Sequence, residues 1–160
     1  MVSARRARRA FGDETWRLAL AGDTSSLHHA ADLLLGEEGD LDYEAHRARA
    51  FALAVEGERD HALAELNEGW TEEWPFPSAY ATDVARVRYL AGDYEDALGA
   101  LRLAVRGAER IEPGVPELAS DCVRRSPRLW PSALRLALAG GTASQRAGAA
   151  WAVLRARVAG

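Results

Sequence analysis

The sequence predicts an all-α fold, a stack of antiparallel helical hairpins with about eight or nine helices. Two observations support this prediction. Of the 160 residues, 48% are hydrophobic and only 8% are aromatic, and the apolar residues are mostly Ala, Leu and Val, which favours helices over strands. In addition, three similar stretches recur at intervals of 35 residues. A fixed period of this length is typical of stacked helical pairs, in which each pair buries its apolar face against a neighbour.

Each of the three similar stretches contains a glycine, and the three glycines predict the turns between helices. Gly22, Gly57 and Gly92 are 35 residues apart. Glycine readily takes the positive φ that ends a helix, and the Asp or Thr behind it can cap the next helix. With the glycines aligned, apolar residues recur at spacings of four, which places them on one helix face. The aligned rows are Leu27, Ala62 and Ala97; Ala31, Leu66 and Leu101; and Leu35, Trp70 and Val105.

Apolar periodicity and helix-breaking residues predict the individual helices in chain order. The longest break falls before the fifth helix, because Pro75 and Pro77 interrupt helical structure. After the sixth helix, a short helix begins near Pro116 and ends at Ser126 and Pro127. The first six helices are expected over residues 4–21, 24–36, 41–56, 59–72, 78–91 and 94–110.

The end of the chain predicts a final hairpin that differs from the others. Residues 135–144 match residues 17–26 at eight of ten positions. The second helix of this hairpin is expected over about residues 142–158, and we expect it to cap the stack. Two of its side chains are predicted to face inward and two outward, namely Trp151 and Leu154, and Arg155 and Arg157.

The third of the similar stretches, LAGDYEDALGALRLAV at residues 90–105, carries a family resemblance. A Gly-Asp-Tyr turn is followed by small Ala97, large Leu101 and small Ala104. This pattern resembles the tetratricopeptide repeat family, and the resemblance covers residues 9–109. It implies a right-handed α-solenoid. In the final hairpin, Arg146 and the pair Ala149-Ala150 are placed as in HEAT-like repeats, which form another α-solenoid family.

The resemblance also implies the domain organisation. A single tetratricopeptide-like domain is expected over residues 1–160. Its repeats would span about residues 7–40, 41–76 and 77–111, and an atypical capping region would span 112–160.

A partner-binding groove follows from the same resemblance, because the first helices of such hairpins line a concave face. The 35-residue register places Trp16, Phe51 and Arg86 on one row of this face, and Gly12, Arg47 and Thr82 one turn earlier. Arg, Trp and Tyr side chains often dominate binding energy, so an acidic or aromatic protein segment is the expected partner. The alternative is that Trp16 and Phe51 belong to the core. The predicted groove residues are Arg9, Trp16, Arg47, Phe51, Arg86 and Tyr89.

Charge is distributed unevenly along the chain. Residues 1–10 carry four Arg and no acid, residues 37–73 carry twelve acids and three Arg, and residues 121–160 carry seven Arg and one acid. An acidic middle disfavours a continuous nucleic-acid track, so nucleic-acid contact through the Arg-rich ends is only the alternative function. No apolar stretch approaches the roughly 20 residues of a membrane span, and a cytoplasmic protein without membrane contact is expected.

The reactive side chains predict no catalytic or metal site. His28 and His29 would point about 100° apart on a helix, which suits one metal ion poorly. His46 and His61 lie on separate predicted helices. We expect each histidine to be exposed or hydrogen-bonded. Cys122 has no evident His partner, so it is expected as a small buried apolar residue.

The sequence therefore predicts a non-enzymatic scaffold that binds a peptide or protein segment, without cofactor or metal. A small enzyme is the remaining alternative, because an active site can lack a recognisable motif. Its pocket would be framed by Trp130, Trp151 and Arg128.

Overall fold

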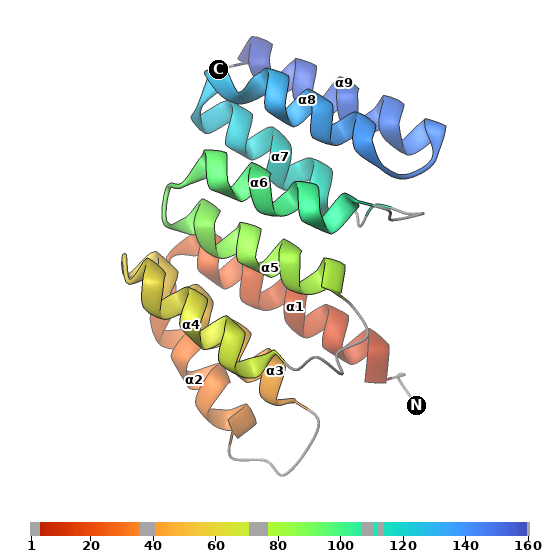
Figure 1. Cartoon of the computed structure of the whole chain (residues 1–160). Helices are drawn as coiled ribbons and strands as arrows, with labels where there is room; N and C mark the ends of the chain where they lie inside the picture. The colour runs from red at the N-terminus through yellow and green to blue at the C-terminus, as the bar shows by residue number, and fades with distance from the viewer. Residues whose placement is uncertain (1–3, 36–40, 71–76, 107–110, 112–113, 160) are drawn as a thin grey trace. The chain divides into compact units, whose positions relative to one another are not determined.

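The chain folds into helices, as a computed structural model shows. The described residues contain no strand, so the all-α prediction is confirmed. They fall into two compact units, Met1–Pro75 and Phe76–Gly160 (Figure 1). Among the described helices, none combines the length and the hydropathy that a membrane-crossing segment needs. The structure describes the backbone of residues 4–35, 41–70, 77–106, 111 and 114–159, and the side chains of 10–35, 41–70, 78–106, 111 and 114–158.

In the first unit, helix α3 has the most extensive contacts. It packs against both α2 and α4, and it also contacts α1. Small residues permit this close packing, because Ala45, Ala48 and Ala52 of α3 have no exposed area. The helices are α1 (Ala4–Ala21), α2 (Thr24–Leu35), α3 (Asp42–Val55) and α4 (Arg59–Gly69).

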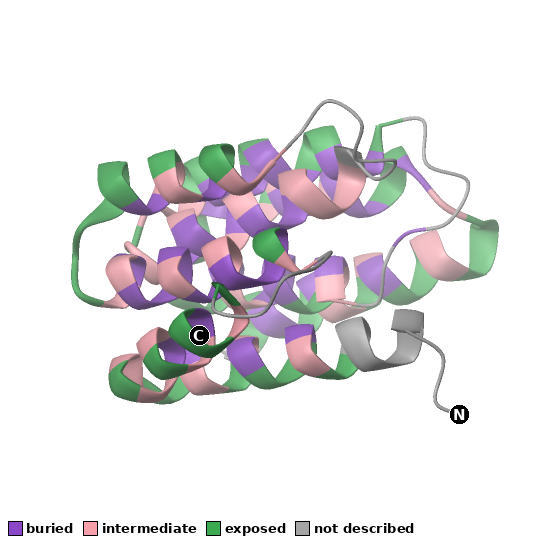
Figure 2. Ribbon diagram, turned by 90° about the horizontal axis from the view of Figure 1, so that it is seen from below, coloured by how far each residue is buried: buried purple, intermediate pink, exposed green. Residues whose placement is uncertain are grey.

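The second unit contains two hairpins and a connecting helix. Helix α5 packs on α6, α6 contacts α7 and α8, and α9 packs on both α7 and α8 (Figure 1). Buried residues lie where neighbouring helices of a unit meet, as the purple segments in Figure 2 show. The elements are α5 (Pro77–Leu90), α6 (Tyr94–Val105), α7 (Gly114–Arg125), the 3₁₀ turn η1 (Pro127–Leu129), α8 (Trp130–Ala139) and α9 (Ala143–Ala159).

The three glycine turns predicted from the 35-residue spacing share one backbone structure. Gly22, Gly57 and Gly92 have φ values of 73°, 89° and 84°. Each glycine donates its N–H to the carbonyl three residues earlier, and the next residue donates to the carbonyl five residues earlier, over 2.8–3.2 Å. This pair of bonds is the Schellman motif, which satisfies carbonyls at the end of a helix. The predicted turns are confirmed.

The apolar rows after these turns are largely buried. In the first two rows, every member has no exposed area: Leu27, Ala62, Ala97, Ala31, Leu66 and Leu101. Burial varies in the third row, where Leu35 is 40% exposed and Val105 is 1% exposed. The predicted stripe therefore holds for the first two turns of each second helix.

The helix boundaries agree with the predictions at most ends. Helix α4 ends at Gly69, earlier than the predicted residue 72. Helix α6 ends at Val105, and most of the remaining predicted stretch to residue 110 lies outside the described residues. A capping box begins α9: the Thr142 N–H donates to Gln145 Oε1 over 3.0 Å, and the Gln145 N–H donates to Thr142 Oγ1 over 3.3 Å.

The predicted inward side of α9 is wrong, whereas Arg155 and Arg157 are exposed as predicted. Trp151 and Leu154 are 61% and 37% exposed. The buried row consists instead of Ala149, Val153 and Ala156, all below 5% exposed. Small residues on this row let α9 lie close to α7 and α8, and a tryptophan ring does not fit into such a close contact.

Candidate functional site

The predicted groove residues of the first unit lie at the contact between α1 and α3. The rings of Trp16 and Phe51 meet edge to face with centroids 5.7 Å apart. The guanidinium of Arg47 lies so close to Gly12 that a Cβ there would be 3.1 Å from Nη2. Both pairs are 35 residues apart, so they meet as the predicted register requires. The side chain of Arg9 lies outside the described residues.

The predicted groove residues of the first unit differ in how far they are buried. Phe51 has no exposed area, and Trp16 is half-buried. The guanidinium carbon of Arg47 lies 6.0 Å from the ring centroid of Tyr43, and its Nε and Nη2 are buried. Phe51 therefore has the core position that the sequence left as an alternative. Partner binding by Trp16 and Arg47 stays a prediction.

The other two predicted groove residues lie on α5 in the second unit. Arg86 Nη1 is 2.9 Å from Asp83 Oδ1, and Asp83 is almost fully buried. Tyr89 is 9% exposed, and its ring centroid lies 5.5 Å from that of Tyr94. A hydrogen bond to Tyr89 raises the pKa of Arg125. Because the predicted residues are divided between the two units, their common groove also stays a prediction.

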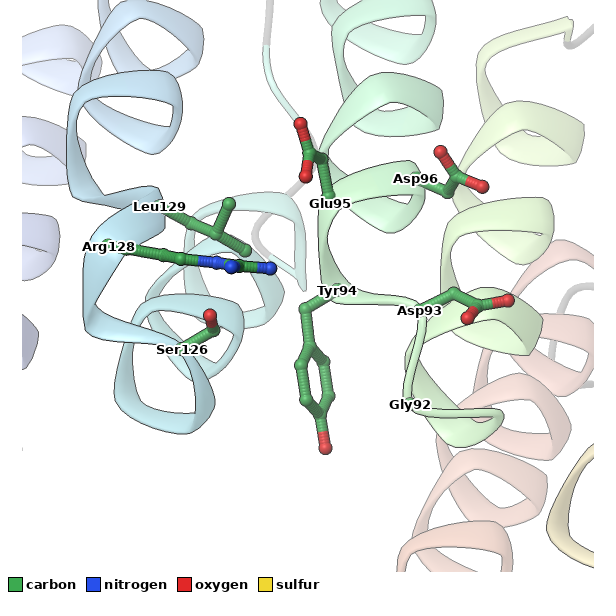
Figure 3. A pocket seen from close by; sticks show the side chains of 8 residues that line it. All are labelled: Gly92, Asp93, Tyr94, Glu95, Asp96, Ser126, Arg128 and Leu129. Atoms are coloured by element: carbon green, nitrogen blue, oxygen red, sulfur yellow. The ribbon is translucent and has the colours of Figure 1, made fainter.

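A pocket of about 320 Å³ opens between α6 and η1 in the second unit. Figure 3 shows Arg128 reaching from η1 toward the first turn of α6. Asp96 at this turn is 3.2 Å from Arg88 Nη1. The pocket carries charges of both signs and can hold a small polar group. Its lining residues are Gly92, Asp93, Tyr94, Glu95, Asp96, Ser126, Arg128 and Leu129.

This pocket differs from the one that the enzyme alternative requires. Arg128 lines it, but the two tryptophans are engaged elsewhere. Trp130 packs under the guanidinium of Arg157 at 4.3 Å, and Trp151 lies 5.9 Å from that of Arg155. Among the described residues, no single pocket is therefore lined by all three of these predicted residues.

A polar network joins α3 and α4 in the first unit, and Arg49 Nη2 extends it to α2 by donating to Asp32 Oδ1 over 3.4 Å. His46 Nδ1 lies 2.8 Å from Glu65 Oε1, and Arg49 Nη1 donates to the same oxygen over 3.3 Å. His46, Glu65 and Glu68 have ligand atoms within 4.8 Å of one another, which is the spacing of a metal site. Glu65 already has Arg49 as a cationic partner. Of the two predicted environments for a histidine, exposed or hydrogen-bonded, His46 has the second.

Cys122 lies in the core of the second unit. It has no exposed area, and burial raises the pKa of its thiol to about 12. A thiol with this pKa carries almost no thiolate at neutral pH, and the thiolate is the nucleophile in cysteine chemistry. The prediction of a buried small residue is confirmed.

Helix α9 has an exposed apolar strip on its outer surface. Trp151, Leu154 and Val158 are 61%, 37% and 89% exposed. Their spacing of three and four residues places them on one side of the helix, and we call this set the α9 face. Sequence reasoning missed this face because it assigned Trp151 and Leu154 to the interior. A row of small residues such as Ala149 and Ala156 was the signal for the true interior.

Comparisons of the chain with protein-family models, curated proteins and solved structures found no match.

Proposed function

We propose that this protein is a non-enzymatic interaction module that binds a segment of another protein on the α9 face. The observation that carries the proposal is the exposure of Trp151, Leu154 and Val158 side by side on one helix. A contiguous exposed apolar patch marks an interaction site more often than isolated apolar residues do. Trp is also the residue type most enriched among those that dominate binding energy.

The free energy available at this face is substantial. With 61% of the Trp151 residue exposed, covering about 150 Å² of its surface would contribute about 4 kcal/mol before the entropic cost of association. Leu154 and Val158 add to this. Because α9 is held by its buried row of small residues, the face is built before the partner arrives, and little ordering cost is incurred.

The finer proposal for the architecture is a right-handed, tetratricopeptide-like α-solenoid. Its support is the shared Schellman turn at Gly22, Gly57 and Gly92, together with the contact of Trp16 with Phe51 across one 35-residue interval. In such a stack the groove with Trp16 and Arg47 would be a second binding surface.

Affinity purification of the tagged full chain from its own cells tests the function. Trp151→Ala should lose the specific partner. Leu33→Ala is the matched control, because Leu33 is an apolar residue of the first unit with nearly the same exposure, 60%. Recovery of the same partners by wild type, Trp151→Ala and a Trp151→Ala/Leu154→Ala double variant would refute the proposal.

A DNA column tests the alternative function at the same time. Retention of the wild-type chain at about 150 mM salt would favour nucleic-acid contact through the arginines, because phosphate binding falls steeply with salt.

A further inference from the structure

We infer that the occupant of the α9 face is an acidic amphipathic helix of a partner protein, an inference that rests on the proposed function. The face offers an apolar row for the apolar side of such a helix and arginines for its carboxylates. Charge, side-chain geometry and surface shape each support this occupant.

The charged residues at the end of the chain are all basic. From Cys122 to Gly160 the chain has seven Arg and no Asp or Glu. Five of these arginines belong to η1, α8 and α9, and within the described part of the chain none of the five forms an ion pair with a carboxylate. The charges of Arg155 and Arg157, which helical spacing places beside the α9 face, are therefore available to an anionic partner. The five are Arg128, Arg135, Arg146, Arg155 and Arg157.

Two of these arginines flank the α9 face and are positioned by aromatic rings. Helical spacing places Arg155 at one edge of the apolar row and Arg157 at the other. The guanidinium of Arg155 lies 5.9 Å from the Trp151 ring centroid, and that of Arg157 lies 4.3 Å from the Trp130 ring centroid. Stacking on a ring leaves the in-plane N–H groups free, and these are the groups that bind a carboxylate in bidentate fashion.

The shape of α9 suits a helix lying against it. Trp151 and Val158 are seven residues apart, which is about 10 Å along the helix axis. This length matches apolar side chains at positions i, i+3 or i+4, and i+7 of a partner helix. Towards the start of α9, Ala147 and Gly148 are exposed, and a Cβ at Gly148 would meet nothing within 4 Å. A partner backbone can approach closely there.

Other occupants fit less well. A second copy paired through α9 would bring two surfaces of like charge together, which is unfavourable. A membrane or a nucleic acid presents an extended anionic surface, which a chain with a net charge of −4 repels as a whole. A short acidic helix contacts the basic surface alone. Leu154 and Val158 also match apolar side chains better than they match phosphate.

The probe for the test is a fluorescein-labelled synthetic helix of about 18 residues, or five turns, with Leu on one face and Glu on both flanks. One control peptide has Lys in place of Glu, and another has the same composition with Leu distributed around the helix. Titration with the full chain is followed by fluorescence anisotropy. We expect the Glu peptide to bind at least tenfold more tightly than either control.

Variants of the full chain connect this binding to the α9 face. Trp151→Ala should weaken binding of the Glu peptide at least tenfold. Arg155→Gln should weaken it severalfold at about 50 mM salt and by less at about 500 mM, because salt screens the ion pair. Leu33→Ala should change it less than twofold. Unchanged circular dichroism of each variant shows that the fold is retained.

The outcomes separate this inference from the proposed function. Equal, Trp151-dependent binding of the Lys and Glu peptides would overturn the acidic partner and leave the interaction module standing. If no helical peptide binds while cellular partners still require Trp151, the helical occupant is overturned. Trp151-dependent binding of phosphatidylserine vesicles or duplex DNA, without binding of the Glu peptide, would replace the occupant by that polyanion. A dimer in sedimentation that Trp151→Ala abolishes would replace it by a second copy.

Discussion

Replacing Gly92 and Gly99 by alanine should change stability in opposite directions, although the chemical change is the same. Both glycines belong to the hairpin of α5 and α6, and a Cβ at either position would meet nothing within 4 Å. Steric contacts therefore cannot distinguish the two variants. The backbone conformation distinguishes them, because Gly92 has a φ of 84° and Gly99 lies inside α6 without a positive φ.

The magnitude follows from the backbone conformation. An L-residue in the left-handed region is less stable by about 1–2 kcal/mol, and alanine recovers about 0.5 kcal/mol by restricting the unfolded chain. Gly92→Ala should therefore lower the free energy of unfolding by about 1 kcal/mol. Gly99→Ala should raise it by about 0.5–1 kcal/mol, because alanine favours the helix interior. The expected difference between the variants is about 1.5–2 kcal/mol.

Urea denaturation followed by circular dichroism measures both values against wild type. The slope of the free energy with urea should stay unchanged, because neither substitution alters the surface exposed on unfolding. If Gly92→Ala were as stable as Gly99→Ala, the turn would not require a positive φ at position 92. The reasoning from the Schellman turn would then be refuted. Gly57→Ala should repeat the loss in the first unit, since its φ is 89°.

Three further predictions concern individual side chains. Trp151→Ala should change the free energy of unfolding by less than about 0.5 kcal/mol. Val153→Ala, at a fully buried position, should lower it by about 2 kcal/mol. Urea denaturation measures both values, and a larger loss for Trp151→Ala than for Val153→Ala would place the Trp151 ring in the core. The Cys122 thiol, with a pKa of about 12, should not react with a thiol-specific disulfide reagent at pH 8 until the chain is unfolded, and rapid labelling of the folded chain would contradict its burial. Hydrogen bonds from Ser26 lower the pKa of Asp23, so its contribution to stability is present above the unfolded-state value near 4 and lost as the pH falls through the lower folded value. Ser26→Ala should flatten the dependence of Tm on pH in that acidic range, and an unchanged dependence would argue against these bonds.

Local signals in the sequence predicted the helices and turns because their causes are local. A glycine that must take a positive φ at a helix end needs only its own backbone and the carbonyls of the preceding turn, and this holds at Gly22, Gly57 and Gly92. The burial of Leu66 and Leu101 follows from the spacing of apolar residues along one helix. The contact of Trp16 with Phe51 was predictable from the same register.

The candidate site was less accessible to sequence reasoning. Helix α9 is rich in alanine, so hydrophobicity alone distinguishes its sides poorly, and assigning the large Trp151 and Leu154 to the interior was the natural expectation. The stacking of Arg157 on Trp130 joins two helices, and no pattern within either helix predicts it. The capping box at Thr142 and Gln145 was readable in principle, because the spacing of three residues is its signature.

Most helix boundaries, and the turns that take a left-handed backbone, could be predicted from the sequence alone. These features depend on interactions among residues a few positions apart. Which side of α9 is covered depends on its packing against α7 and α8, because this contact admits side chains no larger than that of Val153. Because the Trp151 ring does not fit into that contact, an apolar face flanked by arginines lies exposed on this chain.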